Sequence, residues 1–347
     1  QALRQIAIDN CPLDVGPTVL TMRWVFDDLF AALGSAVDDH LTLHRASVLA
    51  RHAWDERGSL DLHADRAQTI DAIGDFAGAD EARRYAAFSA RAAAVFETLD
   101  VPFMRVGNPS MFGLVSHRRF ANLRGLTRIA AFATLWQTLE RHFSDPRLRQ
   151  LFGRYATYCG SSPFSAPGTL MLIAHVETAG VWLIEGGMHR LAQALAALGR
   201  QHGVAHRYGS EVREISVGRA GIDGVLLADG SRLDADIVIS NADIAALSMG
   251  LFGPAARRAV PAVDTGQRSL SAVTLALRAR TSGFPLAHHS VFFSDDYARE
   301  FHEILRERRL PSNPSVYVCA QDRGEHLPAP PAGAFERLFC IINAPAD

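Results

Sequence analysis

The sequence contains no lysine, and all 35 of its basic residues are arginines. A chain without lysine has neither the amine that forms a Schiff base with a carbonyl substrate nor the lysine of a phosphate-binding P-loop. An excess of charge of one sign is missing as well, because 37 acidic residues leave a formal net charge of −2. The chain therefore has no global attraction to a polyanion, and we do not expect nucleic acid as a partner.

Cysteine is scarce, and its four copies lie far apart at Cys11, Cys159, Cys319 and Cys340. They form no C-x-x-C motif and no group with histidine at metal-ligand spacing, so we expect reduced thiols and no bound metal. The adjacent pair His288 and His289 has no acidic or third histidine ligand at helical spacing. We assign this pair a structural or substrate-lining role.

The sequence also lacks an uninterrupted apolar stretch that could form a membrane-spanning helix. The longest uncharged stretch, Tyr155 to Val176, reaches the length of about 20 residues that a bilayer requires. Glycine, serine and proline interrupt it from Gly160 to Gly168. We therefore expect a loop followed by a buried helix from Thr169 to Glu177. The start at Gln1 without an initiator methionine or signal sequence, and the end directly after an apolar run, predict an internal fragment of a longer protein.

Hydrophobic periodicity predicts the other elements. Residues 7–9 and 13–17 are expected to be extended, Val19 to Leu33 to form a helix closed by Gly34, and 41–62 to form short strands joined at Glu56-Arg57-Gly58. The stretch from Arg66 to about Leu151 is mostly helical in pattern, with helices at 80–99 and 126–143. In the carboxyl-terminal part, strands at 272–277, 290–293, 315–320 and 338–343 predict one mixed sheet with an inserted helix, 297–308.

Residues 118–129 alternate arginines with apolar residues. Arg118, Arg119, Arg124 and Arg128 are interleaved with Phe120, Leu123, Leu126 and Ile129. A basic amphipathic helix of this kind can lie on an anionic membrane surface. The alternative is an ordinary solvated face of a core helix, and the sequence leaves both open.

The most informative segment runs from Gly180 to Asp243. Gly186 and Gly187 precede a helix whose apolar residues recur at helical spacing from Leu191 to Leu198, so the glycines let the helix amino terminus approach a ligand closely. A helix amino terminus favours negative charge, which suits a phosphate or an anionic flavin ring. A strand from Glu211 to Val217 then pairs back through 224–227. A second apolar strand, 237–240, delivers Asn241-Ala242-Asp243 at its carboxyl end, where open α/β sheets bind ligands.

These motifs carry a family resemblance. The runs GVW-x-x-x-GGM, EV-x-x-I, GV-x-L-x-DG and VISNAD, together with Asp14-Val-Gly-Pro-Thr18 and Gly160-Ser-Ser-Pro-Phe164, resemble FAD-dependent carotenoid desaturases of the bacterial phytoene desaturase family. The Gly-Gly-Met run and the ending INAPAD are closest to the branch of 1-hydroxycarotenoid 3,4-desaturases. The family's G-x-G-x-x-G motif has no counterpart in these residues.

The resemblance implies an α/β (mixed α+β) fold of the FAD/NAD(P)-binding, Rossmann-like flavin amine oxidase type. The fold is truncated and carries an inserted substrate domain of helices and a mixed sheet. Residues 1–45 and 180–262 would form parts of the FAD-binding domain, and residues 46–179 and 263–347 the substrate and membrane-associated domain. FAD is the implied cofactor; this chain alone is expected to bind it poorly or not at all and to be inactive.

The resemblance also assigns roles to individual residues. The flavin contacts it implies are Gly16, Pro17, Thr18, Gly186, Gly187, Val212, Asn241 and Ala242. The family's proposed Asp/Arg pair would fall at 117–124, which holds arginines and no carboxylate, so no catalytic base is assigned.

The implied substrate is an acyclic, 1-hydroxylated carotenoid. The implied electron acceptor is a quinone or oxygen, and the implied location is peripheral, on the cytoplasmic side of the bacterial inner membrane. Alternatives that stay open are a phytoene desaturase, a carotenoid isomerase or saturase, an amine oxidase, and a non-catalytic carotenoid- or lipid-binding module.

Overall fold

The computed structural model describes residues 3–107, 133–218, 221–263 and 268–346. The chain folds into two compact units, one made of residues 1–195 with 269–346 and the other of residues 196–268. These boundaries differ from the expected division into FAD-binding and substrate parts. That division concerns function and stays a prediction.

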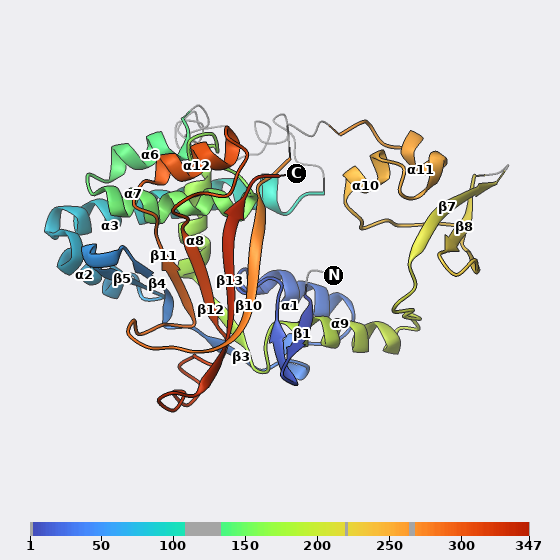
Figure 1. Cartoon of the computed structure of the whole chain (residues 1–347), viewed down its shortest axis with the longest axis horizontal. Helices are drawn as coiled ribbons and strands as arrows, with labels where there is room; N and C mark the ends of the chain where they lie inside the picture. The colour runs from blue at the N-terminus through green and yellow to red at the C-terminus, as the bar shows by residue number, and fades with distance from the viewer. Residues whose placement is uncertain (1–2, 108–132, 219–220, 264–267, 347) are drawn as a thin grey trace. The chain divides into compact units, whose positions relative to one another are not determined.

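A six-stranded mixed sheet is the framework of the first unit, with strand order β10-β13-β12-β11-β4-β5 (Figure 1). Its strands are β4 (Val48–Ala53), β5 (Ser59–His63), β10 (Ser271–Arg280), β11 (His289–Phe292), β12 (Val316–Ala320) and β13 (Phe335–Ala344). Only the pair β4 and β11 is parallel. The predicted mixed sheet of the carboxyl-terminal part is thus confirmed, and the predicted strands between 41 and 62 extend it through β4 and β5.

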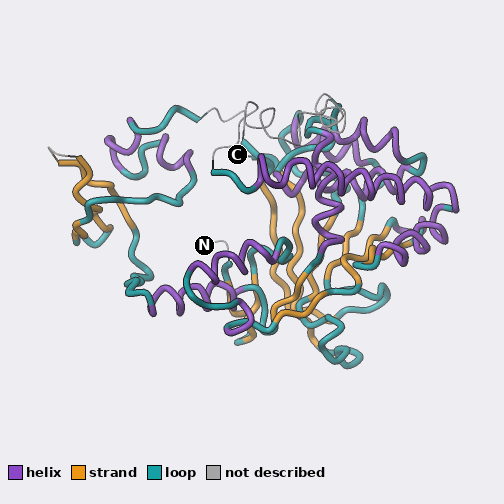
Figure 2. The backbone as a smooth tube through the Cα atoms, turned by 180° about the vertical axis from the view of Figure 1, so that it is seen from behind, coloured by secondary structure: helices purple, strands orange, loops and turns teal. Residues whose placement is uncertain are grey.

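Helices pack beside this sheet, as both views of the backbone show (Figures 1 and 2). They are α2 (Arg66–Ala77), α3 (Ala79–Leu99), α6 (Leu135–His142), α7 (Pro146–Gly153), α8 (Leu172–Ala179) and α12 (Tyr297–Leu305). Their apolar faces meet β4, β5 and β11 in one core, in which Trp54, Phe88 and Phe152 are buried. The predicted helix at 169–177 begins as a 3₁₀ turn, Gly168–Met171, before α8.

Two short two-stranded sheets complete the first unit. The hairpin of β1 (Gln5–Ile8) and β2 (Cys11–Asp14) leads into α1 (Arg23–Ala32), and β3 (Leu43–Arg45) pairs with β6 (Trp182–Ile184), which precedes α9 (His189–Gln201). Leu13 of the hairpin packs against Cys319 and Phe339 of the large sheet. The hairpin therefore covers one face of that sheet.

Strand register decides which side chains share this covered face. Tyr317 lies opposite Val291 and Ile341, and Cys319 lies opposite His289 and Phe339. Residues directly opposite one another on paired strands point to the same side of a sheet. All six side chains consequently point toward the face on which the hairpin lies.

The second unit contains a three-stranded antiparallel sheet, β7 (Val212–Gly218), β8 (Gly221–Leu227) and β9 (Arg232–Asp234), and two short helices, α10 (Ile244–Ser248) and α11 (Gly253–Arg258). The predicted hairpin is confirmed. The predicted buried strand at 237–240 is wrong, because Ile237 and Ile239 are 78% and 91% exposed. No described strand pairs with this segment, so its apolar run has nothing to pack against.

The predicted helix at 126–143 is also wrong in its start. Residues 126–132 lie outside the described residues, as does the whole basic amphipathic stretch 118–129. The described helix α6 begins at Leu135, because the Thr134 side chain accepts a hydrogen bond from the Gln137 backbone N–H and the Gln137 side chain accepts one from the Thr134 backbone N–H. This reciprocal capping box is a strong start signal.

Within the described residues, no helix is both long enough and apolar enough to cross a membrane.

Candidate functional site

The loop that follows β2 is held against the end of β12. The Asp14 backbone N–H donates to the Gln321 side chain at 3.1 Å, and the Gln321 amide donates to the Asp14 carbonyl at 2.7 Å. This paired contact fixes the start of the predicted flavin-contact loop, residues 16–18. The loop therefore leaves β2 along the covered face of the large sheet.

The two glycines before α9 adopt backbone conformations that L side chains rarely reach, with φ of +82° at Gly186 and +93° at Gly187. A Cβ built on Gly187 would lie 2.3 Å from an Asp14 carboxylate oxygen. The same carboxylate accepts a hydrogen bond from the His189 backbone at 3.2 Å. In the structure the Asp14 carboxylate occupies the amino terminus of this helix, and the expected phosphate or anionic flavin ring at this terminus stays a prediction.

A cavity of about 250 Å³ lies beside these glycines, and we call it the glycine cavity. Its wall includes Asp14, Pro17, Thr18, Gly186, Gly187 and Gln321. Four of the predicted flavin contacts are thus brought together, and Gly16 precedes them in the same loop. Val212, Asn241 and Ala242 belong to the second unit, and their part in flavin binding stays a prediction.

A second cavity, of about 310 Å³, lies on the same face of the large sheet, and we call it the arginine cavity. Its wall is mainly apolar and aromatic and includes Val19, Val291, Phe293, Tyr317 and Ile341, together with Arg154. Thr18 lines both cavities. The loop after β2 therefore joins a predicted flavin site to a mostly apolar chamber.

A chain of hydrogen bonds runs inward from Thr18. The Tyr317 hydroxyl donates to Thr18 Oγ1 at 2.7 Å, and it lies 2.7 Å from His289 Nδ1. His289 Nε2 is buried and has no hydrogen-bond partner in the described residues. Burial, aided by the charge of Arg154, holds the pKa of His289 well below its ordinary value. The imidazole is therefore neutral at pH 7.

Arg154 sits in a polar group with Glu177 and Tyr155, which are buried, and with Tyr158, which is 47% exposed. Its Nη1 donates to the Tyr158 hydroxyl at 2.8 Å. Both carboxylate oxygens of Glu177 accept from tyrosines, from Tyr158 at 2.6 Å and from Tyr155 at 2.8 Å. Burial alone would lower the pKa of Arg154, but Tyr158 and Glu177 outweigh that effect and raise it. The guanidinium stays charged.

Sequence reasoning missed this group, although a signal for it exists. Arg154 and Glu177 are the charges that bound the longest uncharged run, one at each end. In the folded chain they approach to 3.7 Å. Opposite charges at the two ends of a long uncharged segment are therefore a sequence signal for a buried ion pair.

The fold brings together one cysteine and two histidines that have no metal-ligand spacing in the sequence, and the expectation of no bound metal stays a prediction. One ligand atom each from His288, His289 and Cys319 lie within 4.8 Å of one another, and His288 Nε2 is 3.6 Å from the Cys319 sulfur. Sequence spacing could not reveal this group because the register of β11 against β12 creates it. Nitrogen and sulfur donors of this kind are those that zinc takes. Burial raises the pKa of Cys319 to about 12, so the thiol is protonated at neutral pH.

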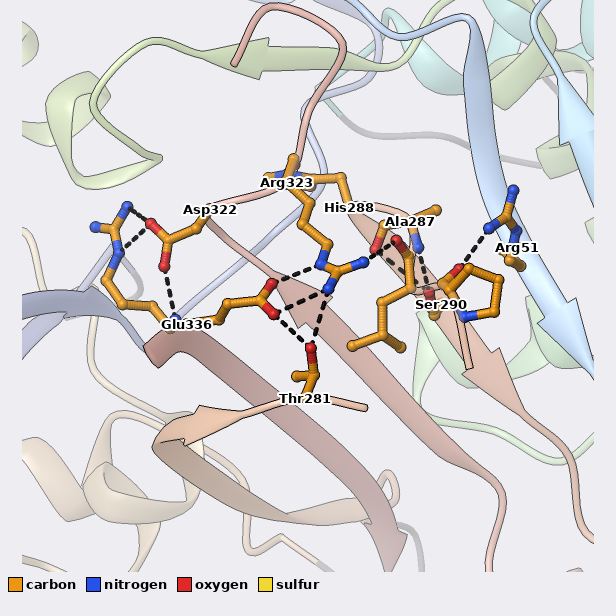
Figure 3. A network of polar contacts seen from close by, with 11 residues as sticks. Arg51, Thr281, Ala287, His288, Ser290, Asp322, Arg323 and Glu336 are labelled. Carbon is orange, nitrogen blue, oxygen red and sulfur yellow. Dashed lines mark hydrogen bonds and ion pairs between the residues drawn. The ribbon is translucent and has the colours of Figure 1, made fainter. Parts of the chain in front are cut away.

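A network of polar contacts orients His288 at the edge of this group (Figure 3). His288 Nδ1 bonds the Arg323 carbonyl, and the Arg323 guanidinium binds Glu336 through two nitrogens, at 2.5 and 2.9 Å. The same guanidinium donates to the Thr281 hydroxyl at 3.0 Å. The Arg323 guanidinium holds the pKa of Glu336 below its ordinary value. This ion pair ties β13 to the loop after β12, and the Arg323 carbonyl of that loop binds His288.

The region expected to correspond to the family's Asp/Arg pair, 117–124, lies outside the described residues. Among the described residues that line the arginine cavity, Tyr317 is the one whose hydroxyl group lies next to the neutral imidazole of His289. When the hydroxyl turns from Thr18 to an unprotonated Nδ1 of His289, the arrangement can accept a proton from a bound molecule at the tyrosine oxygen and pass the phenolic proton to His289.

The fold, with two cavities that share Thr18 in their walls, is that of the flavin-dependent oxidoreductases of the amine oxidase type. An oxidoreductase from Methanosarcina mazei aligns with a TM-score of 0.57 at 14% identity, over 99% of this chain and 70% of that one. A putrescine oxidase double mutant aligns with a TM-score of 0.51 at 12% identity, over 100% of this chain and 68% of that one. The predicted fold class is confirmed.

The chain belongs to the family of flavin containing amine oxidoreductases, whose model matches residues 10–334. It is 49% identical to a hydroxyneurosporene desaturase of Rubrivivax gelatinosus over 99% of this chain and 66% of that protein. It is 45% identical to one from Cereibacter sphaeroides, again over 66% of that protein, and 38% identical to one from Rhodobacter capsulatus, over 68%. The resemblance to carotenoid desaturases is confirmed. The chain spans just under two thirds of the length of the first two relatives.

The prediction of FAD is confirmed by this family membership, and the described residues fit the ring part of the cofactor. The wall of the glycine cavity bears no side chain at Gly186 and Gly187, where a planar ring can lie against the backbone. The Gln321 amide and the Arg337 guanidinium offer polar groups to the edge of such a ring. Pro17, Thr18, Gly186 and Gly187 are the residues that would hold it.

Proposed function

We propose that the protein containing this chain is an FAD-dependent desaturase of an acyclic 1-hydroxycarotenoid. It removes a hydride and a proton from neighbouring carbons and so adds one double bond to the polyene. The observation that carries the proposal is the junction at Thr18, where a mostly apolar chamber meets the predicted flavin site. The three relatives named as hydroxyneurosporene desaturases support the choice of substrate.

The chamber supplies orientation and exclusion of water. Val19, Val291, Phe293 and Ile341 offer an apolar and aromatic wall to a hydrocarbon chain. Flavin, when bound, accepts a hydride at its N5 atom. Because the positive charge left on the substrate is spread along the conjugated chain, positioning at Thr18 provides most of the help that the protein needs to give.

The second carbon must then lose a proton, and a weak base suffices for this step. Tyr317 faces the chamber, and burial raises its pKa well above the ordinary value, so it is a neutral phenol. For this step the Tyr317 hydroxyl turns its single proton from Thr18 Oγ1 to the unprotonated Nδ1 of neutral His289, 2.7 Å away; the oxygen then receives the substrate proton while the phenolic proton passes to Nδ1. We assign this proton transfer to Tyr317 and His289, because the sequence alone identified no catalytic base.

The location and the electron acceptor follow from the substrate. A carotenoid is insoluble in water, so the protein acts as a peripheral enzyme on the cytoplasmic side of the bacterial inner membrane, where membrane quinone or oxygen reoxidises the flavin. The basic apolar stretch 118–129 is the segment we propose for contact with anionic lipids.

The test is an assay of product structure. The protein, expressed from its complete coding sequence and loaded with FAD, is incubated with a 1-hydroxycarotene, and pigments are separated by chromatography. The proposal expects a product with one more conjugated double bond and a red-shifted absorption spectrum. An unchanged pigment, next to an active phytoene desaturase as control, would contradict it. A shifted double-bond geometry without mass change would indicate an isomerase, and tight pigment binding without conversion would indicate a binding module.

A further inference from the structure

The arginine cavity contains a charged group that the proposed chemistry does not use. Among the described residues of its wall, Arg154 alone carries a charge, and it is only 9% exposed. It lies in the 3₁₀ segment Arg154–Cys159, which follows α7. A cation costs several kcal/mol to bury unless it is paired and hydrogen-bonded. A chamber built for pure hydrocarbon has no need of one.

The partners of Arg154 leave part of its hydrogen-bonding capacity free. Its Nη1 donates to Tyr158, while its Nε and Nη2 have no acceptor in the described residues. Glu177 lies 3.7 Å from Nη2, beyond hydrogen-bond distance, and both of its oxygens already accept from tyrosines. The carboxylate thus balances the charge without satisfying the two donors.

Nε and Nη2 of Arg154 therefore require a neutral oxygen atom as hydrogen-bond acceptor. Because Glu177 already compensates the positive charge, a ligand carboxylate is not needed for balance. A hydroxyl, ether or carbonyl oxygen accepts hydrogen bonds from an arginine without bringing charge into the cavity. Asn343, on β13, also lines this wall, and its side chain makes no hydrogen bond within the described residues, so it adds a second polar group that can face the same oxygen.

We propose that Arg154 binds an oxygen substituent at the end of the polyene and thereby selects oxygenated carotenoids over the corresponding hydrocarbons. The inference rests on the proposed function, because it assumes that the polyene lies in the arginine cavity. A site built to hydrogen-bond a substrate hydroxyl rejects the analogue that lacks it, since buried donors are then left unpaired. Arg154 is in this account a binding and specificity residue.

The geometry of the substrate agrees with this placement. In a 1-hydroxycarotene the carbon that bears the oxygen is two bonds from the nearest carbon of a new 3,4 double bond, roughly 2.5 Å away. The polar group must therefore lie close to the flavin. Thr18, which lines the predicted flavin site, lines the same cavity as Arg154.

The experiment compares two substrates that differ only in the hydroxyl group, an acyclic carotene and its 1-hydroxy derivative. The FAD-loaded protein from the complete coding sequence is assayed as wild type, Arg154→Met, Arg154→Lys and the control Arg51→Met. Arg51 pairs with Asp61 at 2.6 Å and does not line the arginine cavity. Thermal melts of every variant check folding.

The proposal expects Arg154→Met to lower kcat/KM for the hydroxylated substrate at least tenfold and to leave the hydrocarbon within twofold. Arg154→Lys keeps the cation and restores part of the preference, and Arg51→Met leaves the preference unchanged. Equal losses on both substrates, or no loss, would overturn the inference and leave the proposed function standing.

A binding measurement distinguishes a failure of the inference about Arg154 from a failure of the proposed function. If the wild type converts neither substrate, the proposed function fails, and the Kd of each pigment is then measured by quenching of tryptophan fluorescence. The inference expects the hydroxylated pigment to bind the wild type at least tenfold more tightly than it binds Arg154→Met. Equal affinities would refute it.

Discussion

The substitution that removes the charge of Glu177 is the most severe test of how the buried Arg154 guanidinium is stabilised. In Glu177→Gln the guanidinium stays buried at 9% exposure but loses the carboxylate that balances it. Two charge-assisted hydrogen bonds, from Tyr155 and Tyr158, become neutral ones. Breaking one partner out of a buried ion pair costs about 3–5 kcal/mol. A loss of this size is a large part of the total of about 5–15 kcal/mol expected for a domain.

Urea unfolding followed by tryptophan fluorescence measures the loss, because all four tryptophans lie in the first unit. The exposed Glu140, changed to Gln, is the control and should stay within about 0.5 kcal/mol of wild type. Adding Arg154→Met to Glu177→Gln removes the uncompensated charge and should recover about 2 kcal/mol or more. A loss below about 1 kcal/mol in Glu177→Gln, or strictly additive effects in the double variant, would refute the reasoning.

Three further predictions follow from single features. Gly187→Ala forces a Cβ to 2.3 Å from a carboxylate oxygen at φ +93°, so we expect a loss of about 2 kcal/mol or more and weaker FAD binding. Gly34→Ala, at φ +72° with nothing within 4 Å, should cost only about 1 kcal/mol in the same melts. Cys159 is exposed, whereas burial raises the pKa of Cys319 to about 12, so a thiol reagent should label Cys159 in the folded protein and Cys319 only after unfolding. Burial keeps the pKa of His289 well below its ordinary value, so the unfolded chain binds a proton below about pH 6.5 that the folded chain does not. His289 should then contribute up to about 1.4 kcal/mol per pH unit to the fall of the free energy of unfolding toward acid, beside the contribution of the buried His52, whose pKa burial also lowers, and His289→Asn should reduce the slope by that share; an unchanged slope would contradict the assignment.

The strands of the large sheet were predictable because their apolar patterns are local. The runs at 315–320 and 338–343 are almost wholly apolar, as expected for strands buried in a sheet, and both are strands in the structure. The same reasoning failed at 237–240. An apolar run indicates that a segment favours burial, but it does not show whether a neighbouring strand is present to pair with it. In this case Ile239 remains 91% exposed.

The site was predictable only in part, for a similar reason. Pro17, Thr18, Gly186 and Gly187 came from motifs, and the structure places them in one cavity wall. Their roles toward flavin stay predictions. Cys319 and His289 are 30 residues apart in the chain and become neighbours through strand register, which no periodicity encodes. Arg154 was overlooked because an isolated arginine in sequence is normally a solvated one.

The central claim is that a polyene in the arginine cavity delivers a hydride to flavin held at Thr18. Anaerobic mixing of the FAD-loaded protein with a 1-hydroxycarotene tests it in one turnover. The account predicts bleaching of the flavin absorption, matched by one equivalent of a carotenoid with one more double bond. Flavin that stays oxidised, with the substrate recovered unchanged, would contradict the account.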